Sequence, residues 1–149
     1  MIAKYKDQYF CVDLTSSPKE LWRYDYVQNF QKCIDGKLVY YSKFVDITEI
    51  DEIFDVGFSA LWNGEWCGFE YSEELNKMEV YSNNPDFAKE YDMETVDRLF
   101  YSKVVPANSV NSFRITFEDM HGKITNYKDI TLEELPALWK QFKTDLMPH

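Results

Sequence analysis

Apolar and polar positions in the first third of the chain predict a strand followed by a helix. Residues 9–14 form a short apolar run typical of a strand. Ser17 followed by Pro18 is typical of a helix start, because the hydroxyl accepts from free backbone amides and proline fits the first helical position. Four apolar side chains then recur at helical spacing: Trp22, Tyr26, Phe30 and Cys33. Gly36 supplies a stop signal, so we expect an N-terminal helix over residues 17–34.

The middle of the chain is rich in β-branched and aromatic residues and predicts an antiparallel sheet. Strands are expected over four ranges: 38–45, 78–81, 99–105 and 113–117. A loop over residues 119–122 then returns the chain along residues 124–127 as a hairpin. The strongest local signal is Asn63–Gly64 between two apolar runs, which favours a two-residue type I′ hairpin.

The predicted hairpin fixes which side chains share a face. Its register pairs Trp62 with Glu65 and Leu61 with Trp66, and alternation places Trp62 on the more apolar face. We therefore expect Trp62 in the core. Trp66 falls on the opposite face with Gly68, where it is either an exposed anchor for a partner or part of a second apolar layer. Both interpretations stay open from the sequence.

The C-terminal segment predicts an amphipathic helix. Thr131 and Glu134 have the spacing of a capping box, and an apolar stripe follows. The stripe consists of Leu135, Leu138, Trp139, Phe142 and Leu146. Together the elements predict a single α+β domain over residues 1–149. We expect a two-layer sandwich in which an N-terminal and a C-terminal helix cover one face of the antiparallel sheet.

Composition excludes several classes of protein. The 149 residues are 45% hydrophobic, which excludes a disordered chain, and no apolar stretch approaches the ~20 residues of a membrane span. The formal net charge of −10 disfavours direct binding to nucleic acid or anionic lipid. Three widely spaced cysteines, Cys11, Cys33 and Cys67, do not form a disulfide framework or a zinc motif. The first ten residues lack the apolar core of a signal peptide, so we expect a cytoplasmic protein.

Negative charge is concentrated in residues 46–97. This segment contains fifteen acidic residues against Lys77 and Lys89, a formal charge of −13. Solubility alone is one explanation. A confined field that steers a basic partner is the other. A calcium site is not favoured, because residues 46–52 lack the central glycine of an EF-hand loop. The partner-binding candidates are Asp46, Glu49, Asp51, Glu52, Asp55, Glu65, Trp66, Glu70, Glu73 and Glu74.

Catalytic motifs are not visible in the sequence. The two histidines are His121, in a predicted hairpin loop, and His149, and neither accompanies a nucleophile motif or a phosphate-binding glycine loop. We therefore expect no catalytic residue, no metal site and no cofactor. Carboxylates and aromatic rings are abundant, so a small hydrolase or a sugar-binding module remains an alternative.

In size, acidity, aromatic content and expected layout, the chain resembles the small acidic immunity proteins with which bacteria neutralise toxins. The resemblance implies a non-enzymatic cytoplasmic protein that covers the active site of a basic toxin domain, often a nuclease. Glu70, Glu73 and Glu74 would then pair with basic toxin side chains, and Trp66 would supply a desolvated anchor. No motif carries the resemblance, so no functional residue is transferred from it. An adaptor or regulatory subunit that binds another basic partner is the alternative in a different class.

Overall fold

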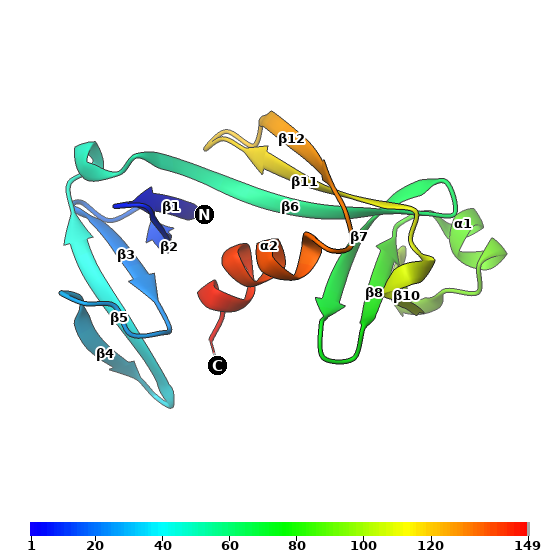
Figure 1. Cartoon of the computed structure of the whole chain (residues 1–149), viewed down its shortest axis with the longest axis horizontal. Coiled ribbons are helices and arrows are strands. Elements are labelled where there is room, and N and C mark those ends of the chain that lie inside the picture. The colour runs from blue at the N-terminus through cyan, green and yellow to red at the C-terminus, as the bar shows by residue number, and fades with distance from the viewer. Residues whose placement is uncertain (149) are drawn as a thin grey trace. The chain divides into compact units, whose positions relative to one another are not determined.

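The computed structural model describes residues 1–148, so His149 lies outside the described residues. The chain is mostly β, with 53% of residues in strands and 16% in helices. Twelve strands are linked in an antiparallel sheet, and the two α-helices are short (Figure 1). The predicted α+β sandwich with an N-terminal and a C-terminal helix is therefore wrong.

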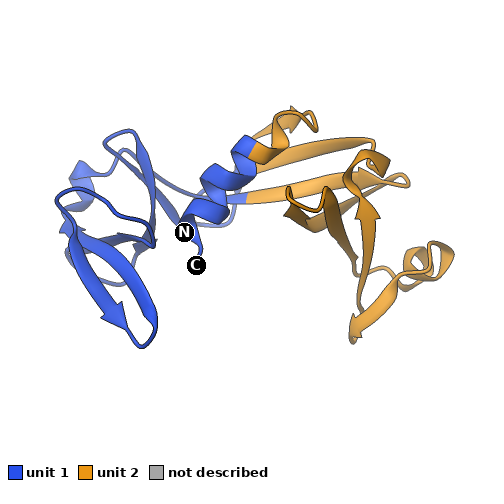
Figure 2. Cartoon of the chain, turned by 60° about the horizontal axis from the view of Figure 1, so that its bottom comes forward, with its two compact units in different colours: residues 1–56, 117–125, 137–149 blue, residues 57–116, 126–136 orange. Residues whose placement is uncertain are grey.

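The chain divides into two compact units, and each is assembled from separate stretches of sequence (Figure 2). Unit 1 comprises residues 1–56, 117–125 and 137–149, and unit 2 comprises residues 57–116 and 126–136. The prediction of one domain over the whole chain is not tested by this division and stays a prediction.

Unit 1 contains a run of antiparallel strands in which β5 lies beside β3 and β6 beside β1. Their hydrogen-bonded order is β4-β5-β3-β2-β1-β6, and a 3₁₀ turn, η1 (Ile47–Glu49), precedes β6. The bounds are β1 (Ile2–Tyr5), β2 (Gln8–Asp13), β3 (Lys19–Arg23), β4 (Gln31–Asp35), β5 (Leu38–Val45) and β6 (Glu52–Trp62), of which residues 52–56 belong to unit 1.

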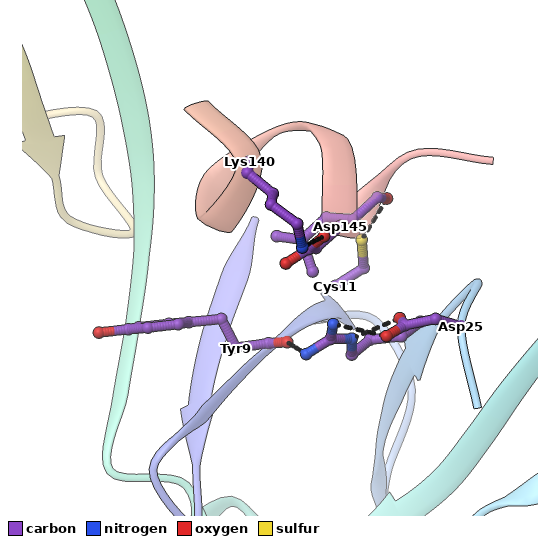
Figure 3. Close-up of polar contacts among 7 residues, drawn as sticks. Tyr9, Cys11, Asp25, Lys140 and Asp145 are labelled. Carbon is purple, nitrogen blue, oxygen red and sulfur yellow. Dashed lines mark hydrogen bonds and ion pairs between the residues drawn. The ribbon is translucent and has the colours of Figure 1, made fainter. Parts of the chain in front are cut away.

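Apolar side chains cover both faces of the unit 1 sheet. One face buries a cluster formed by Ala3, Tyr5, Phe10, Val12, Leu21 and Val45. On the other face, the ring of Phe142 lies 5.0 Å from that of Tyr9 and 6.1 Å from that of Phe54. The thiol of Cys11 also donates to the carbonyl oxygen of Leu146 at 3.6 Å (Figure 3). The C-terminal residues of the chain thus pack against the strands at its start.

The segment expected as an N-terminal helix forms β3 and β4 instead. Ser17 and Pro18 lie in the connection between β2 and β3, and Leu21 pairs with Val12 and is fully buried. The residues of the expected apolar stripe do not pack on one shared surface. Phe30 stacks on Phe10 with ring centroids 5.0 Å apart, whereas Tyr26 is exposed and its ring contacts that of Tyr41. Pairing with the flanking strands β2 and β5 therefore overrides the helical spacing. The Asp35–Gly36 stop signal marks the turn of the β4–β5 hairpin, where Gly36 has φ +59°.

Unit 2 contains a second run of antiparallel strands, in the order β6-β7-β8-β10-β9, with β11 paired to both β12 and β6. Helix α1 follows β8, and η2 follows β10. The bounds are β7 (Glu65–Ser72), β8 (Lys77–Ser82), α1 (Pro85–Glu90), β9 (Glu94–Asp97), β10 (Phe100–Pro106), η2 (Ala107–Ser109), β11 (Ser112–Glu118) and β12 (Ile124–Ile130). The loop between β11 and β12 carries His121, as predicted, and belongs to unit 1.

The Asn63–Gly64 hairpin is confirmed with its predicted register. Asn63 and Gly64 have φ values of +51° and +82°, which a type I′ turn requires. Trp62 pairs with Glu65, and Leu61 pairs with Trp66. Trp62 is 6% exposed and packs against Phe87 of α1 at 5.6 Å, which confirms its place in the core.

The C-terminal helix is present but shorter than its apolar stripe. Helix α2 (Leu135–Phe142) is followed by a separate 3₁₀ turn, η3 (Thr144–Leu146). The capping box forms as predicted, because the amide of Glu134 donates to the Thr131 hydroxyl while the amide of Thr131 donates to the Glu134 carboxylate. Within residues 1–148, no helix has the length and apolar character needed to cross a membrane.

Candidate functional site

The ten predicted partner-binding residues divide equally between the two units. Five belong to unit 1, namely Asp46, Glu49, Asp51, Glu52 and Asp55. The other five belong to unit 2, namely Glu65, Trp66, Glu70, Glu73 and Glu74. The acidic segment recognised in the sequence therefore contributes to two separate bodies.

Several of the unit 1 acids have structural partners. Asp46 caps η1, because its carboxylate accepts from the Thr48 amide at 2.9 Å, and this bond lowers the pKa of Asp46. Glu49 completes the capping box by accepting from the amide of Asp46 at 2.9 Å. Asp55 forms an ion pair with the α-amino group of Met1 at 3.6 Å. These contacts account for three of the five acids without a partner molecule.

The strongest candidate site is a groove of about 650 Å³ in unit 2, which we call the unit 2 groove. It lies against β7, β8 and the start of β10. Its lining residues are Glu65, Trp66, Gly68, Tyr81, Ser82, Asn83, Asn84 and Phe100. None of these eight is basic, and two of the predicted residues, Glu65 and Trp66, are among them.

Aromatic rings form the walls of the unit 2 groove. Tyr81 and Phe100 stack with ring centroids 5.1 Å apart and an interplanar angle of 13°. Trp66 is 39% exposed. Its side chain is therefore accessible to a partner and is not fully buried in a second apolar layer. Gly68 pairs with Tyr81 across β7 and β8, and a Cβ atom built on Gly68 would meet no atom within 4 Å. The missing side chain leaves the floor of the groove open.

The indole of Trp66 is held from one side by an arginine. The guanidinium of Arg114 lies 4.4 Å from the Trp66 ring centroid and 4.5 Å from that of Tyr127. Asp129 fixes the cation by accepting from its Nε at 2.7 Å, which raises the pKa of Arg114. Arginine stacked between two rings and paired with a carboxylate holds Trp66 in one orientation.

Glu65 is oriented by a polar network at one end of the groove. Its carboxylate accepts hydrogen bonds from the Ser82 hydroxyl at 3.1 Å and from the side-chain Nδ2 of Asn84 at 3.4 Å. The side-chain oxygen of Asn84 in turn caps α1 by accepting from the Asp86 and Phe87 amides. The start of α1 and the floor of the groove are thus joined through Asn84.

Two further carboxylates share the outer face of β7 and β8. Glu70 lies directly opposite Glu79, and alternation places both on the side that carries Gly68 and Tyr81. Burial and the nearby charges of Glu79 and Glu70 raise the pKa of Tyr81. We define the unit 2 face as the unit 2 groove together with Glu70 and Glu79.

Charge and exposed apolar surface coincide in unit 2. The unit contains thirteen acidic and six basic residues, a formal charge of −7 out of −10 for the chain. Val104, which pairs with Glu79, is 61% exposed, and Leu99, next to Phe100, is 55% exposed. An acidic surface with exposed aromatic and aliphatic groups is suited to bind Lys and Arg side chains, whose charged heads are attached to aliphatic chains.

Sequence reasoning found part of this face and missed the rest. Trp66 and Glu70 were found from strand alternation, whereas Glu73 and Glu74 are exposed in the turn between β7 and β8 and do not line the groove. Glu79 and Tyr81 alternate with buried Met78 and Val80, a signal that places them on the outer face. Phe100 and the supporting Arg114 came from distant strands and left no local signal, and Asn84, the cap of α1 just after β8, was also missed.

Within residues 1–148, no three His, Cys, Asp or Glu side chains gather in a way that would hold a metal ion. His121 is exposed, and its amide donates to Asp119 at 2.9 Å in the hairpin loop.

Comparison with known proteins places the chain in a family. Searches of curated proteins and of solved structures each returned no match. A family model described as "Uncharacterised conserved protein UCP033725" matches residues 2–118, which include all of the unit 2 groove. The chain therefore belongs to the UCP033725 family.

Proposed function

We propose that the protein is a non-enzymatic binding protein that captures a basic protein partner on the unit 2 face. The observation that carries the proposal is the unit 2 groove, in which Trp66 and the stacked Tyr81 and Phe100 flank an open glycine floor beside carboxylates. Lysine and arginine side chains match this surface, because their stems pack on rings while their charges approach carboxylates.

Two physical roles are distinct on this face. Glu70, Glu79 and the wider charge of unit 2 raise the association rate through long-range attraction. Trp66 acts as the anchor, since a pre-oriented tryptophan loses little conformational entropy when a partner covers it. The acids therefore govern how fast the complex forms, and the rings govern how long it lasts.

The biological role we favour is that of a cytoplasmic immunity protein, whose partner is a basic toxin domain such as a nuclease. Blocking an active site requires only tight coverage, which agrees with a face that has rings and carboxylates. An adaptor bound to another basic protein would use the same chemistry and differs only in the identity of the partner.

Co-expression with the product of the gene immediately upstream tests this role. We expect a complex that copurifies at low salt and weakens at high salt, together with rescue of host growth from toxicity. Gly68→Val should abolish rescue, because a branched side chain fills the floor of the groove while suiting a strand. The control is Glu133→Gln, an exposed acid of unit 2 outside the face, which should rescue growth fully. Absence of both complex and toxicity would reject the immunity role.

A carbohydrate is the second candidate ligand. Asn83 and Asn84 lie in the groove beside the aromatic walls, and amides with flat rings are the groups that hold sugars. The two candidates differ in salt dependence, because a neutral sugar would bind equally well at low and high ionic strength.

A further inference from the structure

Unit 1 contains a groove of its own, of about 500 Å³, which we call the unit 1 groove. Its volume falls within the roughly 300–1,000 Å³ typical of small-ligand pockets. Its walls include three half-buried aromatic rings, Trp22, Tyr24 and Tyr40. None of its residues belongs to the unit 2 face.

Strand register brings these rings together. Trp22 in β3 and Tyr40 in β5 lie on the same face, because Trp22 pairs with Ser42 and Tyr40 is two residues before Ser42. Tyr24 follows β3, and its ring meets that of Tyr40 at 6.4 Å in an edge-on arrangement of 60°. Because neighbouring strands hold these residues, the rings form a preorganised wall.

Three carboxylates line the same groove: Asp13, Glu20 and Asp35. Asp13 and Glu20 lie directly opposite each other on β2 and β3, where like charges destabilise a sheet. Within residues 1–148, the carboxylates of Glu20 and Asp35 form no ion pair and accept no hydrogen bond; the contact of Glu20 with Ser16 is made by its backbone amide. Burial, together with the neighbouring carboxylates of Glu20 and Asp35, raises the pKa of Tyr40.

Two basic groups beside the groove already have polar partners. Lys19 donates to the carbonyl oxygens of Leu14 and Ser16, both at 2.8 Å. The α-amino group of Met1, a residue on the groove wall, pairs with Asp55 at 3.6 Å. Rings and carboxylates therefore line a groove to which no Lys, Arg or His side chain contributes.

We propose that the unit 1 groove binds an alkylammonium cation, with its carbon substituents against Trp22, Tyr24 and Tyr40 and its charge beside Glu20, Asp13 and Asp35. Ring faces attract such cations, and the attraction grows when the cation is desolvated. Binding would also relieve the repulsion between Asp13 and Glu20. The cation is carried either by a small quaternary ammonium compound or by a lysine side chain, and both present the same chemistry.

Titration of the ¹⁵N-labelled full chain tests this site, with the Trp22 indole N–H as the reporter. The probes are choline, its uncharged carbon isostere 3,3-dimethylbutanol, and N-acetyl-lysine methylamide. We expect saturable shifts of the Trp22 resonance with choline or the lysine derivative, and binding at least about 10-fold weaker for the neutral isostere. Tighter binding of choline indicates a small quaternary ligand, and tighter binding of the lysine derivative indicates a protein side chain.

Charge-removing variants make the test specific. Glu20→Gln and Asp35→Asn keep the side-chain shape and should each weaken binding of the cation about 5–10-fold. Glu52→Gln, an exposed acid of unit 1 outside the groove, should leave it unchanged. The proposal is overturned if neither cation gives saturable shifts at Trp22, if the neutral isostere binds equally well, or if both groove variants bind as tightly as the native chain. Binding to a basic protein through unit 2 would survive any of these results.

Discussion

Glu70 and Glu79 lie directly opposite each other on neighbouring strands, with both carboxylates on the outer face of unit 2. Like charges in this position oppose folding, and the sheet gains nothing from them on its own. Asp13 and Glu20 repeat the arrangement in unit 1. Each pair borders a groove with aromatic walls, which is why we assign both to recognition of positively charged groups.

Glu70→Gln should stabilise the free protein, because it removes the repulsion from Glu79 while keeping the side-chain shape. The expected gain is about 0.2–1 kcal/mol in the free energy of unfolding at low salt, and it should shrink at high salt because screening weakens the repulsion. Urea denaturation at two ionic strengths measures it. The same gain in Glu133→Gln, outside the face, would mean that only the net charge matters.

Gly57→Ala should destabilise unit 2 by steric conflict. A Cβ atom at Gly57 would lie 2.7 Å from Oγ1 of Thr116, closer than contacts in folded proteins allow. We expect a loss of about 1–3 kcal/mol in the free energy of unfolding. In a Thr116→Ala background the same change should cost less, and Gly68→Ala, where the space is open, should cost nothing. Equal losses of stability in Gly57→Ala and Gly68→Ala would contradict the close pairing of β6 with β11 at Thr116.

Local signals were sufficient to predict two of the hairpins, at Asn63–Gly64 and at residues 119–122. Asn63–Gly64 requires positive φ at both turn residues, and this requirement alone fixed the pairing of Leu61 with Trp66. The capping box at Thr131 and Glu134 was equally local. Residues 17–34 could not be predicted in this way, because the strand containing Leu21 is stabilised by pairing with Val12 and with β5, which both lie outside this segment.

The same distinction applies to the candidate site. Trp66 was located from alternation around a local turn, and the acids were visible from composition alone. Phe100 and Arg114 enter the site through pairing of β10 with β8 and of β11 with β6, and no local pattern specifies those pairings. Sequence alone also gave no sign that residues 46–97 are shared between two units.

Cys67 should be unreactive in the folded protein. Its side chain is 2% exposed, and burial, reinforced by the carboxylate of Glu65, raises its pKa to about 11. At pH 8 very little thiolate exists, and the reagent has no access to it. Iodoacetamide labelling followed by peptide mass spectrometry should therefore leave Cys67 unmodified in the native state and modify it in urea. Equal labelling in both states would contradict its burial.

The ion pair between Arg114 and Asp129 should give a defined pH dependence. The hydrogen bond from Arg114 lowers the pKa of Asp129 below its ordinary value of 3.8. A lowered carboxyl pKa stabilises the folded state above the unfolded value, and this contribution is lost as the pH falls through the folded value. Asp129→Asn should thus destabilise the protein near neutral pH, with a difference that begins to shrink near pH 3.8 and is lost as the pH falls through the lower pKa of the folded state. Chemical denaturation of both proteins from pH 7 to pH 3 measures the difference, and a constant offset would contradict the ion pair.

We propose that the unit 2 face attracts and anchors a basic protein. The most direct test of this proposal is the association rate constant between this protein and the co-expressed upstream gene product, measured by stopped flow at low and high salt. We predict that association slows about 10-fold or more as the salt concentration rises. The Glu70→Gln, Glu79→Gln double variant should associate more slowly and with a weaker salt dependence. Trp66→Ala should mainly increase the dissociation rate. An association rate constant that changes with neither the salt concentration nor these substitutions would contradict the proposed role of the unit 2 face.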